Sequence, residues 1–387
     1  MIKCVYCSDE EFDLGKGSEE HAILSSLGGK KISKNICCQK CNNHFGDEID
    51  KYFSKSFEYI SNIVGIKTGR NKSASTIKNA GVMNGHQFYL KPGGLPSFSK
   101  PIFLCQEKDD NTVQVDIRAR DLNEANYLVK NLEKKYGRPL DSMSDIKIEV
   151  VTDYLREPTT INFEMGGELF FRSIAKMMLT YLATVCAPAR LRDGATDEII
   201  NYIKGDTSAR DSIILSYDYN SEFPSNQLTC KVSHLIFIWA DPESKLVFCG
   251  LRLFGHMQFS AKLSSMWNGG EIKKCYQIDP ICGEGIDIDI DFNSKSIRSI
   301  IENIGYNEAS LEKAKLALKE DILELNQKVA LNSTIDRAAE AQLARQELSN
   351  ETLDNFAKAV LTDIQNQVIK QPSTEVLTLE QLKRLGK

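Results

Sequence analysis

Two Cys-x-x-Cys pairs near the N-terminus constrain this chain more than any other feature. Cys4 and Cys7 form the first pair, Cys38 and Cys41 form the second, and 30 residues lie between them. Pairs at this spacing are typical of two knuckles that close a tetrahedral four-thiolate zinc site across a loop. We therefore expect one structural zinc ion that organises a segment too polar to form its own core. Cys37 is an alternative to Cys38, but only Cys38 keeps the Cys-x-x-Cys spacing to Cys41.

The segment between and just after the pairs carries residues with useful chemistry, namely Glu20, His21, Asn35 and Asn42. A neutral imidazole can take a proton from water near neutral pH, which hydrolytic chemistry requires. A carboxylate together with an amide oxygen suits a hard divalent cation such as Mg²⁺ or Mn²⁺. This combination favours metal-assisted hydrolysis as the chemistry of the segment.

Two runs of residues carry a resemblance to a known family. They are Glu20-His21-Ala22-Ile23-Leu24-Ser25-Ser26-Leu27-Gly28-Gly29 and Asn35-x-x-Cys38-x-x-Cys41-Asn42-Asn43-x-x-Gly46. These runs resemble the HNH endonuclease family, in the branch that carries a four-cysteine zinc site. The resemblance covers roughly residues 1 to 62 and implies a zinc-stapled ββα-metal (treble-clef-like) unit.

The resemblance also implies a role for each site residue. Glu20 and Asn42 become ligands of the catalytic Mg²⁺ or Mn²⁺, His21 becomes the general base, and Asn35 orients His21. The chain departs from the family at two positions, because Leu24 stands where many members have Pro and Asn42 where many have His. Neighbours of Asn42 that could take its ligand position are Asn43 and His44.

Basic residues cluster around this segment although the net charge of the chain is −5. Six cations and one acid lie between residues 51 and 78, and four further lysines lie inside the motif at positions 30, 31, 34 and 40. Such clusters are expected where a protein follows a phosphate backbone. We expect Lys51, Lys55, Arg70 and Lys72 to bind nucleic acid; an ordinary solvated surface is the alternative.

The chain of 387 residues is long enough for two or three domains, and its pattern predicts an α+β protein. We expect an HNH head at residues 1–65, a mixed α+β body at 80–300 and a helical tail at 306–387. Apolar periodicity predicts a helix at 41–61, just after the second cysteine pair. Strands are predicted at 87–90, 101–105, 112–117, 146–151, 212–216, 232–239, 246–254 and 274–278, and helices at 122–136, 167–185 and 197–203.

The helix predicted at 167–185 is apolar nearly all round, so a membrane span has to be considered. Arg172 and Lys176 would then lie within the hydrocarbon, which favours a buried central helix instead. With eleven cysteines and no apparent secretory signal, we expect a reducing, cytoplasmic location and no membrane partner.

Two further segments have recognisable patterns. The alternating run Asp287-Ile288-Asp289-Ile290-Asp291 predicts an edge strand with one acidic face. In the tail, apolar residues step by three and four from Leu311 to Val329 and from Leu353 to Val368. These helices either pack on the body or form a seam between two chains of a homodimer.

These patterns together predict a metal-dependent HNH endonuclease that cuts double-stranded DNA. The body would respond to a regulatory protein or a small-molecule trigger, as in a prokaryotic restriction or anti-phage defence system, and this last step rests on analogy. The alternative is a catalytically inactive, zinc-stapled module that binds nucleic acid.

Overall fold

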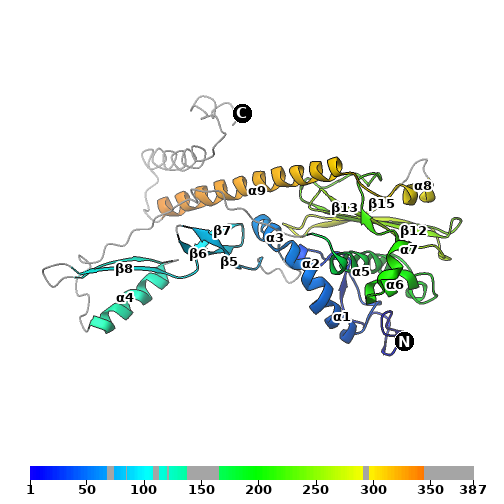
Figure 1. Ribbon diagram of the computed structural model, residues 1–387, viewed down its shortest axis with the longest axis horizontal. Helices are drawn as coiled ribbons and strands as arrows, with labels where there is room; N and C mark the ends of the chain where they lie inside the picture. Colours follow the sequence, from blue (N-terminus) through cyan, green and yellow to red (C-terminus); the bar gives the residue numbers. More distant parts are fainter. Residues whose placement is uncertain are drawn as a thin grey trace, which may run out of the picture. The chain divides into compact units, whose positions relative to one another are not determined.

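The computed structural model describes residues 1–67, 74–83, 85–107, 113–119, 122–136, 165–290 and 296–343 (Figure 1). The chain divides into two compact units. The larger unit comprises residues 1–76, 92–94 and 162–324, and the smaller unit comprises 77–91, 95–161 and 325–387. The predicted head and residues 162–300 of the predicted body fall in the same unit. Whether residues 1–65 fold by themselves stays a prediction.

A six-stranded antiparallel sheet forms the centre of the larger unit, with the strand order β10-β13-β12-β11-β14-β15. Four of its strands were predicted within two residues, whereas β13 was missed and the strand predicted at 212–216 overlaps the end of helix α7 (Arg210–Ile213). The strands are β10 (Ser216–Tyr217), β11 (His234–Asp241), β12 (Leu246–Leu253), β13 (Met257–Ser264), β14 (Ile272–Ile278) and β15 (Gly285–Asp289).

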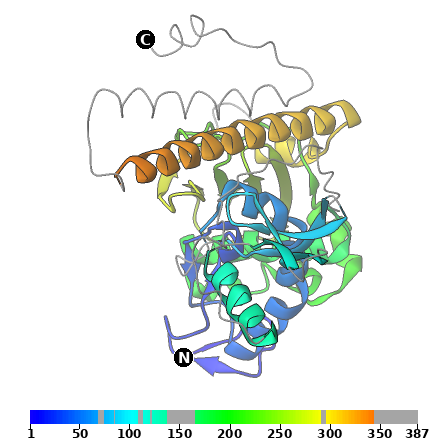
Figure 2. The same cartoon turned by 90° about the vertical axis from the view of Figure 1, so that its left-hand side faces the viewer.

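Both faces of the sheet are covered, which explains why β11 is a continuous apolar run with seven buried residues. Leu235, Phe237 and Trp239 share a core with helix α8 (Ile297–Glu302). The alternate residues face the other layer, where helix α5 (Glu168–Val185) lies against the sheet (Figures 1 and 2). The edge strand β15 is confirmed, with Asp287 and Asp289 exposed.

Helix α5 is the buried central helix that the sequence predicted. Fourteen of its residues are buried, among them Arg172 and Lys176. Within the described residues, no helix combines the length and apolarity that a membrane crossing requires. The other helical segments of this part of the chain are η3 (Pro188–Leu191), α6 (Asp197–Lys204), η4 (Thr207–Ala209), α7 (Arg210–Ile213) and α9 (Glu308–Leu343). Of helix α9, residues 308–324 belong to the larger unit.

Short strands and an interrupted helix build the head. The strands pair as two hairpins, β1 (Ile2–Lys3) with β2 (Glu11–Phe12) and β3 (Glu20–His21) with β4 (Ile32–Ser33). The helix predicted at 41–61 is divided into α1 (Gln39–Phe45), a π-helical turn η2 (Gly46–Asp50), α2 (Lys51–Ser56) and α3 (Glu58–Val64). A short 3₁₀ turn, η1 (Ser25–Leu27), lies between β3 and β4.

The two glycines after η1 are required by close packing. Gly28 has φ +83°, and a Cβ atom there would lie 3.0 Å from Pro280. A Cβ atom on Gly29 would lie 1.7 Å from the carbonyl oxygen of Ile23, which no side chain can tolerate. The Gly-Gly pair of the motif therefore lets the head turn tightly against the segment after β14.

The smaller unit contains a three-stranded antiparallel sheet, a hairpin and a helix. Its elements are β5 (Ile77–Met83), β6 (His86–Lys91), β7 (Leu95–Phe98), β8 (Ile102–Glu107), β9 (Val113–Arg118) and α4 (Leu122–Tyr136). Helix α4 has the bounds that its periodicity predicted. The strand expected at 146–151 and the tail helix expected at 353–368 lie outside the described residues.

Candidate functional site

The four predicted zinc ligands meet at one point. The Sγ atoms of Cys4, Cys7, Cys38 and Cys41 all lie within 4.8 Å of one another, and those of Cys7 and Cys38 are 4.0 Å apart. The first Cys-x-x-Cys pair directly follows strand β1. The second lies at the start of helix α1, where the backbone amide of Cys41 donates to the Cys38 sulfur. Four converging thiols are the ligand set that tetrahedral zinc prefers, so this cluster could hold one zinc ion.

Cys37 takes a different part from its neighbour Cys38. Its side chain is buried, and its thiol donates a hydrogen bond of 3.3 Å to Oε1 of Glu20. Burial, followed by the nearby Glu20 carboxylate, raises the pKa of the Cys37 thiol above its ordinary value. The four-thiol cluster therefore contains Cys38 and not Cys37, and zinc ligation by Cys38 stays a prediction.

Strand β3 places Glu20 and His21 on opposite sides. Glu20 pairs with Ser33 and is only 1% exposed, whereas His21 pairs with Ile32 and is half-buried. Successive side chains in a strand point to opposite faces, so the two proposed catalytic residues do not converge by local geometry.

The Glu20 carboxylate is bound by a lysine from outside the head. Nζ of Lys176, on helix α5, lies 2.5 Å from Oε2 of Glu20 and 2.8 Å from Oδ2 of Asp50. Burial lowers the pKa of Lys176, but the attraction of Glu20 and Asp50 outweighs burial and leaves that pKa above its ordinary value. The ammonium group is therefore charged and joins two carboxylates of the head.

His21 keeps a free imidazole. None of the described residues makes a hydrogen bond with its ring, and burial, followed by repulsion from Lys176, lowers the pKa of His21. A lowered pKa keeps the ring neutral, which is the form that can accept a proton from water.

Asn35 does not reach His21 as expected. Its side-chain oxygen accepts a 2.7 Å hydrogen bond from the amide of Gly15, and its backbone carbonyl accepts one from Arg192 at 2.8 Å. Asn35 thus fixes the loop after β2 and its attachment to the segment after α5. The clamp on His21 that the resemblance implied is not formed in this structure.

The side chain of Asn42, in helix α1, lies beside strand β3. Its amide nitrogen donates to Oγ of Ser18 at 2.6 Å and to the carbonyl of Glu19 at 3.0 Å, which places it beside β3. Its alternatives have other contacts, because Asn43 accepts from Gln39 at 2.7 Å and His44 lies 3.4 Å from Glu48. Asn42 therefore bonds to the segment directly before β3.

The chemistry of Glu20 and Asn42 suits a divalent ion, but the arrangement of Glu20 does not. Both of its carboxylate oxygens have donors, and it is shielded from solvent. The fully buried hydroxyl of Tyr6 has no partner among the described residues and lies near enough for Glu20 to contribute, after burial, to its raised pKa. An ion at Glu20 would have to replace Lys176 as the partner of its carboxylate.

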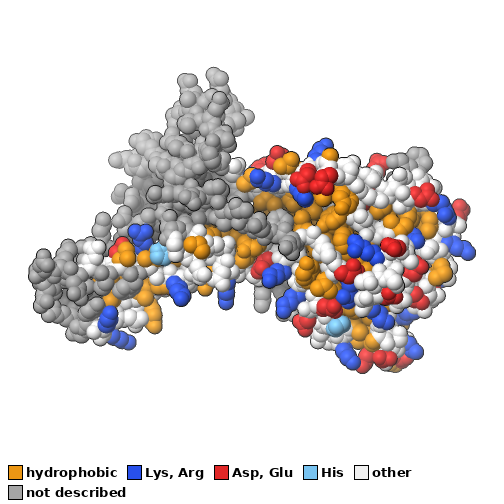
Figure 3. All heavy atoms as spheres, viewed as in Figure 1, with side chains coloured by type: hydrophobic (Ala, Val, Ile, Leu, Met, Phe, Trp, Pro, Cys, Tyr) orange, Lys and Arg blue, Asp and Glu red, His pale blue; other side chains and the backbone are white. Residues whose placement is uncertain are grey.

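The predicted nucleic-acid-binding residues are only partly described. Lys51 and Lys55 are exposed on α2 and line a cavity of about 330 Å³ together with Ser26 and Ser54. Arg70 and Lys72 lie outside the described residues. On the face of the larger unit that Figure 3 shows, basic and acidic side chains are interspersed, so no broad basic patch is visible there.

Reasoning from the sequence missed Lys176 and Asp50. The available signal was a pair of cations, Arg172 and Lys176, four residues apart in an apolar helix. Such cations need buried partners. The structure supplies them, because Arg172 contacts Glu48 at 3.0 Å while Lys176 contacts Glu20 and Asp50.

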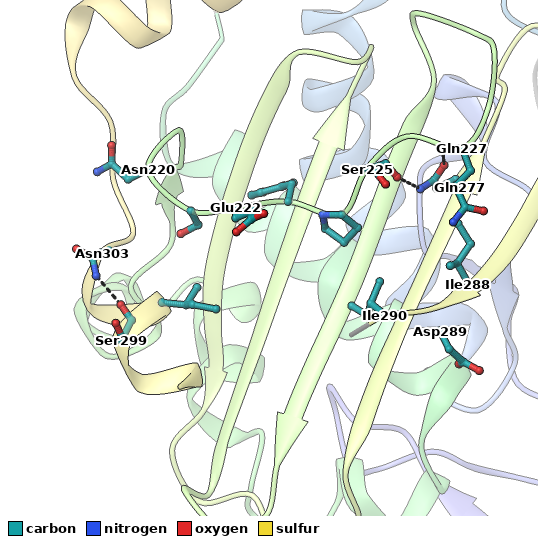
Figure 4. A pocket seen from close by; sticks show the side chains of 14 residues that line it. Asn220, Glu222, Ser225, Gln227, Gln277, Ile288, Asp289, Ile290, Ser299 and Asn303 are labelled. Carbon is teal, nitrogen blue, oxygen red and sulfur yellow. Dashed lines mark hydrogen bonds between the residues drawn. The ribbon is translucent and has the colours of Figure 1, made fainter. Parts of the chain in front are cut away.

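A second concave site lies over the sheet face that α8 covers. This cavity of about 740 Å³ is bounded by the loop at 220–227, the β14–β15 edge and α8 (Figure 4). Its walls carry amide and hydroxyl groups over apolar side chains such as Phe223, Ile288 and Ile290. Among the described residues that line it none is Lys or Arg, so the cavity favours a neutral or cationic ligand over a phosphate.

One of three comparisons with known proteins gave a match, and it covers the head. A family model described as HNH endonuclease matches residues 4–58, which contain the four cysteines, Glu20, His21, Asn35 and Asn42. Comparison with curated proteins and with solved structures gave no match.

Proposed function

Because residues 4–58 match the HNH endonuclease family, we propose that this protein is a metal-dependent endonuclease that hydrolyses DNA phosphodiester bonds. His21 is the general base and takes a proton from the attacking water. The observation that supports this role is its half-buried imidazole on strand β3, which has no hydrogen-bond partner among the described residues and whose pKa burial lowers.

The proposal assigns Glu20 and Asn42 as ligands of a divalent ion. When bound, such an ion would neutralise charge on the phosphate and the leaving oxygen. The chain itself supplies the remaining parts: the zinc cluster fixes the start of α1, and the bonds of Asn42 to Ser18 and Glu19 hold that start against β3. Lys51 and Lys55 attract the phosphate backbone through α2.

A specific observation favours a second candidate, an inactive module that binds nucleic acid. The Lys176 ammonium already neutralises Glu20, and the Asn35 side-chain oxygen bonds the Gly15 amide instead of the His21 ring. A zinc-stapled scaffold that uses its acids to attach to α5 would have this arrangement. Binding without cleavage is what this candidate predicts.

Plasmid nicking separates the two candidates. The full chain with Mg²⁺ or Mn²⁺ should relax supercoiled plasmid, and His21→Ala should reduce the rate by at least about 100-fold, since a general base contributes that much. The exposed His86→Ala in the smaller unit is the matched control and should leave the rate unchanged. Equal rates for His21→Ala and the wild type with every divalent ion would refute the nuclease assignment to this site.

As the biological context we propose an effector of restriction or anti-phage defence whose activity depends on a trigger. The cavity of about 740 Å³ supports this part, because it lies in the same unit as the head and is lined by groups that suit a neutral or cationic ligand. Titration with nucleosides and with nucleotides, followed by protein fluorescence, tests it. Binding of nucleotides alone, through their phosphates, would contradict it.

A further inference from the structure

We propose that Lys176 is an ionic latch on the proposed nuclease site. Its ammonium holds the Glu20 carboxylate that the divalent ion needs, so that ion binding at Glu20 requires the side chain of Lys176 to withdraw. This inference rests on the proposed function, and it assigns control of that site to a residue outside the segment that matches the family.

The contacts of Lys176 carry the first step. The side chain is 1% exposed and lies between two acids of the head, at 2.5 Å from Glu20 and 2.8 Å from Asp50. No ordinary packing need explains a cation in a helix of which 14 residues are buried. A charge placed there is stable only because both carboxylates surround it.

Competition is the second step. Each cation that reaches Glu20 gains from the same negative charge, and two cations at one carboxylate repel each other strongly at low dielectric. Both oxygens of Glu20 already have donors, the Cys37 thiol at Oε1 and the Lys176 ammonium at Oε2, so a metal ion gains a carboxylate oxygen when Lys176 leaves.

The third step concerns helix α5, which makes further contacts with the turn η2 of the head. Arg172 binds Glu48 at 3.0 Å, and Ser173 donates to Asp50 at 3.0 Å. These residues and Lys176 lie on one face of α5, and their hydrogen bonds to the head reach the π-helical turn η2 and strand β3. A change in the position of α5 would therefore change the access of an ion to Glu20.

The decisive measurement is Mn²⁺ binding to the full chain by isothermal titration calorimetry. Lys176→Met should tighten Mn²⁺ binding by at least about ten-fold relative to the wild type. Adding Glu20→Gln to Lys176→Met should abolish this gain. Arg172→Met is the matched control, since it breaks the neighbouring ion pair on the same helix and leaves Lys176 in place; it should not tighten Mn²⁺ binding.

Folding is checked by zinc content and far-UV circular dichroism, because Lys176→Met leaves two buried acids without their cation. If that variant is unfolded, Lys176→Gln keeps a hydrogen-bond donor at the position without the charge and takes its place. An unchanged Mn²⁺ affinity in the folded variant overturns the latch. His21-dependent nicking could still stand in that case, so the failure of the latch is distinct from the failure of the proposed function.

A measurement on the wild type needs no variant to fold. Lysine acetylation, read by mass spectrometry, should leave Lys176 unmodified without Mn²⁺ and modify it when Mn²⁺ is saturating. The exposed Lys55 is the internal control and should react equally in both conditions. Protection of Lys176 that persists while Mn²⁺ binds in a Glu20-dependent way would contradict the latch.

Discussion

At the scale of single residues, the interface between the head and the sheet depends on buried polar groups with one permitted protonation state. His234 on β11 is fully buried, with Nε2 3.0 Å from the carbonyl of Leu27 and Nδ1 accepting from the amide of Phe254 at 3.0 Å. Only the neutral ring makes both contacts. Burial lowers the pKa of His234 to about 4.

This arrangement predicts a pH dependence of stability. The unfolded chain binds a proton at His234 below about pH 6.5 and the folded chain only near pH 4, so stability is full above pH 6.5 and is lost as pH falls between these values. The loss attributable to His234 should reach at most about 3 kcal/mol. Urea unfolding of the wild type and His234→Gln at pH 7 and pH 4.5 measures it as a difference. A wild-type difference no larger than that of His234→Gln would contradict this account.

At the scale of elements, two short segments need outside support to keep their shape. The knuckles around Cys4 and Cys38 have little regular structure of their own, because β1 and β2 contain only two residues each, and their thiols converge at one point. Helix α2 in turn is held by Phe53 and Phe57, whose rings lie 4.6 Å and 5.9 Å from Phe170. Its lysines are left on the outer side.

Zinc is therefore expected to stabilise the head. Cys38→Ser should lose one zinc ion per chain and unfold the knuckles, since metal-ligand bonds replace a hydrophobic core there. Metal analysis by mass spectrometry and amide hydrogen exchange of residues 1–45 measure this. Cys37→Ser is the matched control and should keep its zinc; an equal loss of zinc in both variants would mean that Cys37 is a ligand.

Helix α2 is expected to contribute to DNA affinity rather than to catalysis. Replacing both Lys51 and Lys55 with Ala should weaken binding and reduce the slope of log affinity against log salt by about 0.9 for each lost phosphate contact. Fluorescence anisotropy with duplex DNA at several salt concentrations gives that slope. Lys204→Ala, an exposed lysine at the end of α6, should leave it unchanged.

At the scale of the whole molecule, the head is a part of the larger unit. Its contacts with other segments include the Arg192 bonds to the carbonyls of Lys3 and Asn35, at 2.6 Å and 2.8 Å. The Phe57 ring also lies 5.2 Å from Phe254. Direct contacts therefore attach the head to other segments of the larger unit.

This packing predicts how the protein behaves after proteolysis. The segment 68–80 is rich in small and charged residues, so limited trypsin digestion should cut there first. The two fragments should nevertheless elute together in size-exclusion chromatography under native conditions, because the aromatic and ionic contacts of the head persist. Separate elution of a folded head would show instead that residues 1–65 form an independent domain.

The sequence by itself determined the parts whose causes are local. Ligand spacing identified the four cysteines, since zinc geometry restricts which residues can be neighbours across a knuckle. Apolar periodicity located α4, α5 and α6 within a residue of their observed bounds, because helices of this kind bury one face or all faces. The alternation around Asp289 likewise indicated an edge strand.

Only the tertiary structure decided which distant residues meet. Lys176 lies 156 positions from Glu20, and no local pattern connects an apolar helix to a two-residue strand. The same holds for Asp50 and for the contact of Asn35 with Gly15, which replaces its expected contact with His21. Buried charges find partners through packing across the whole unit, so the electrostatic state of a site is settled only when the chain has folded.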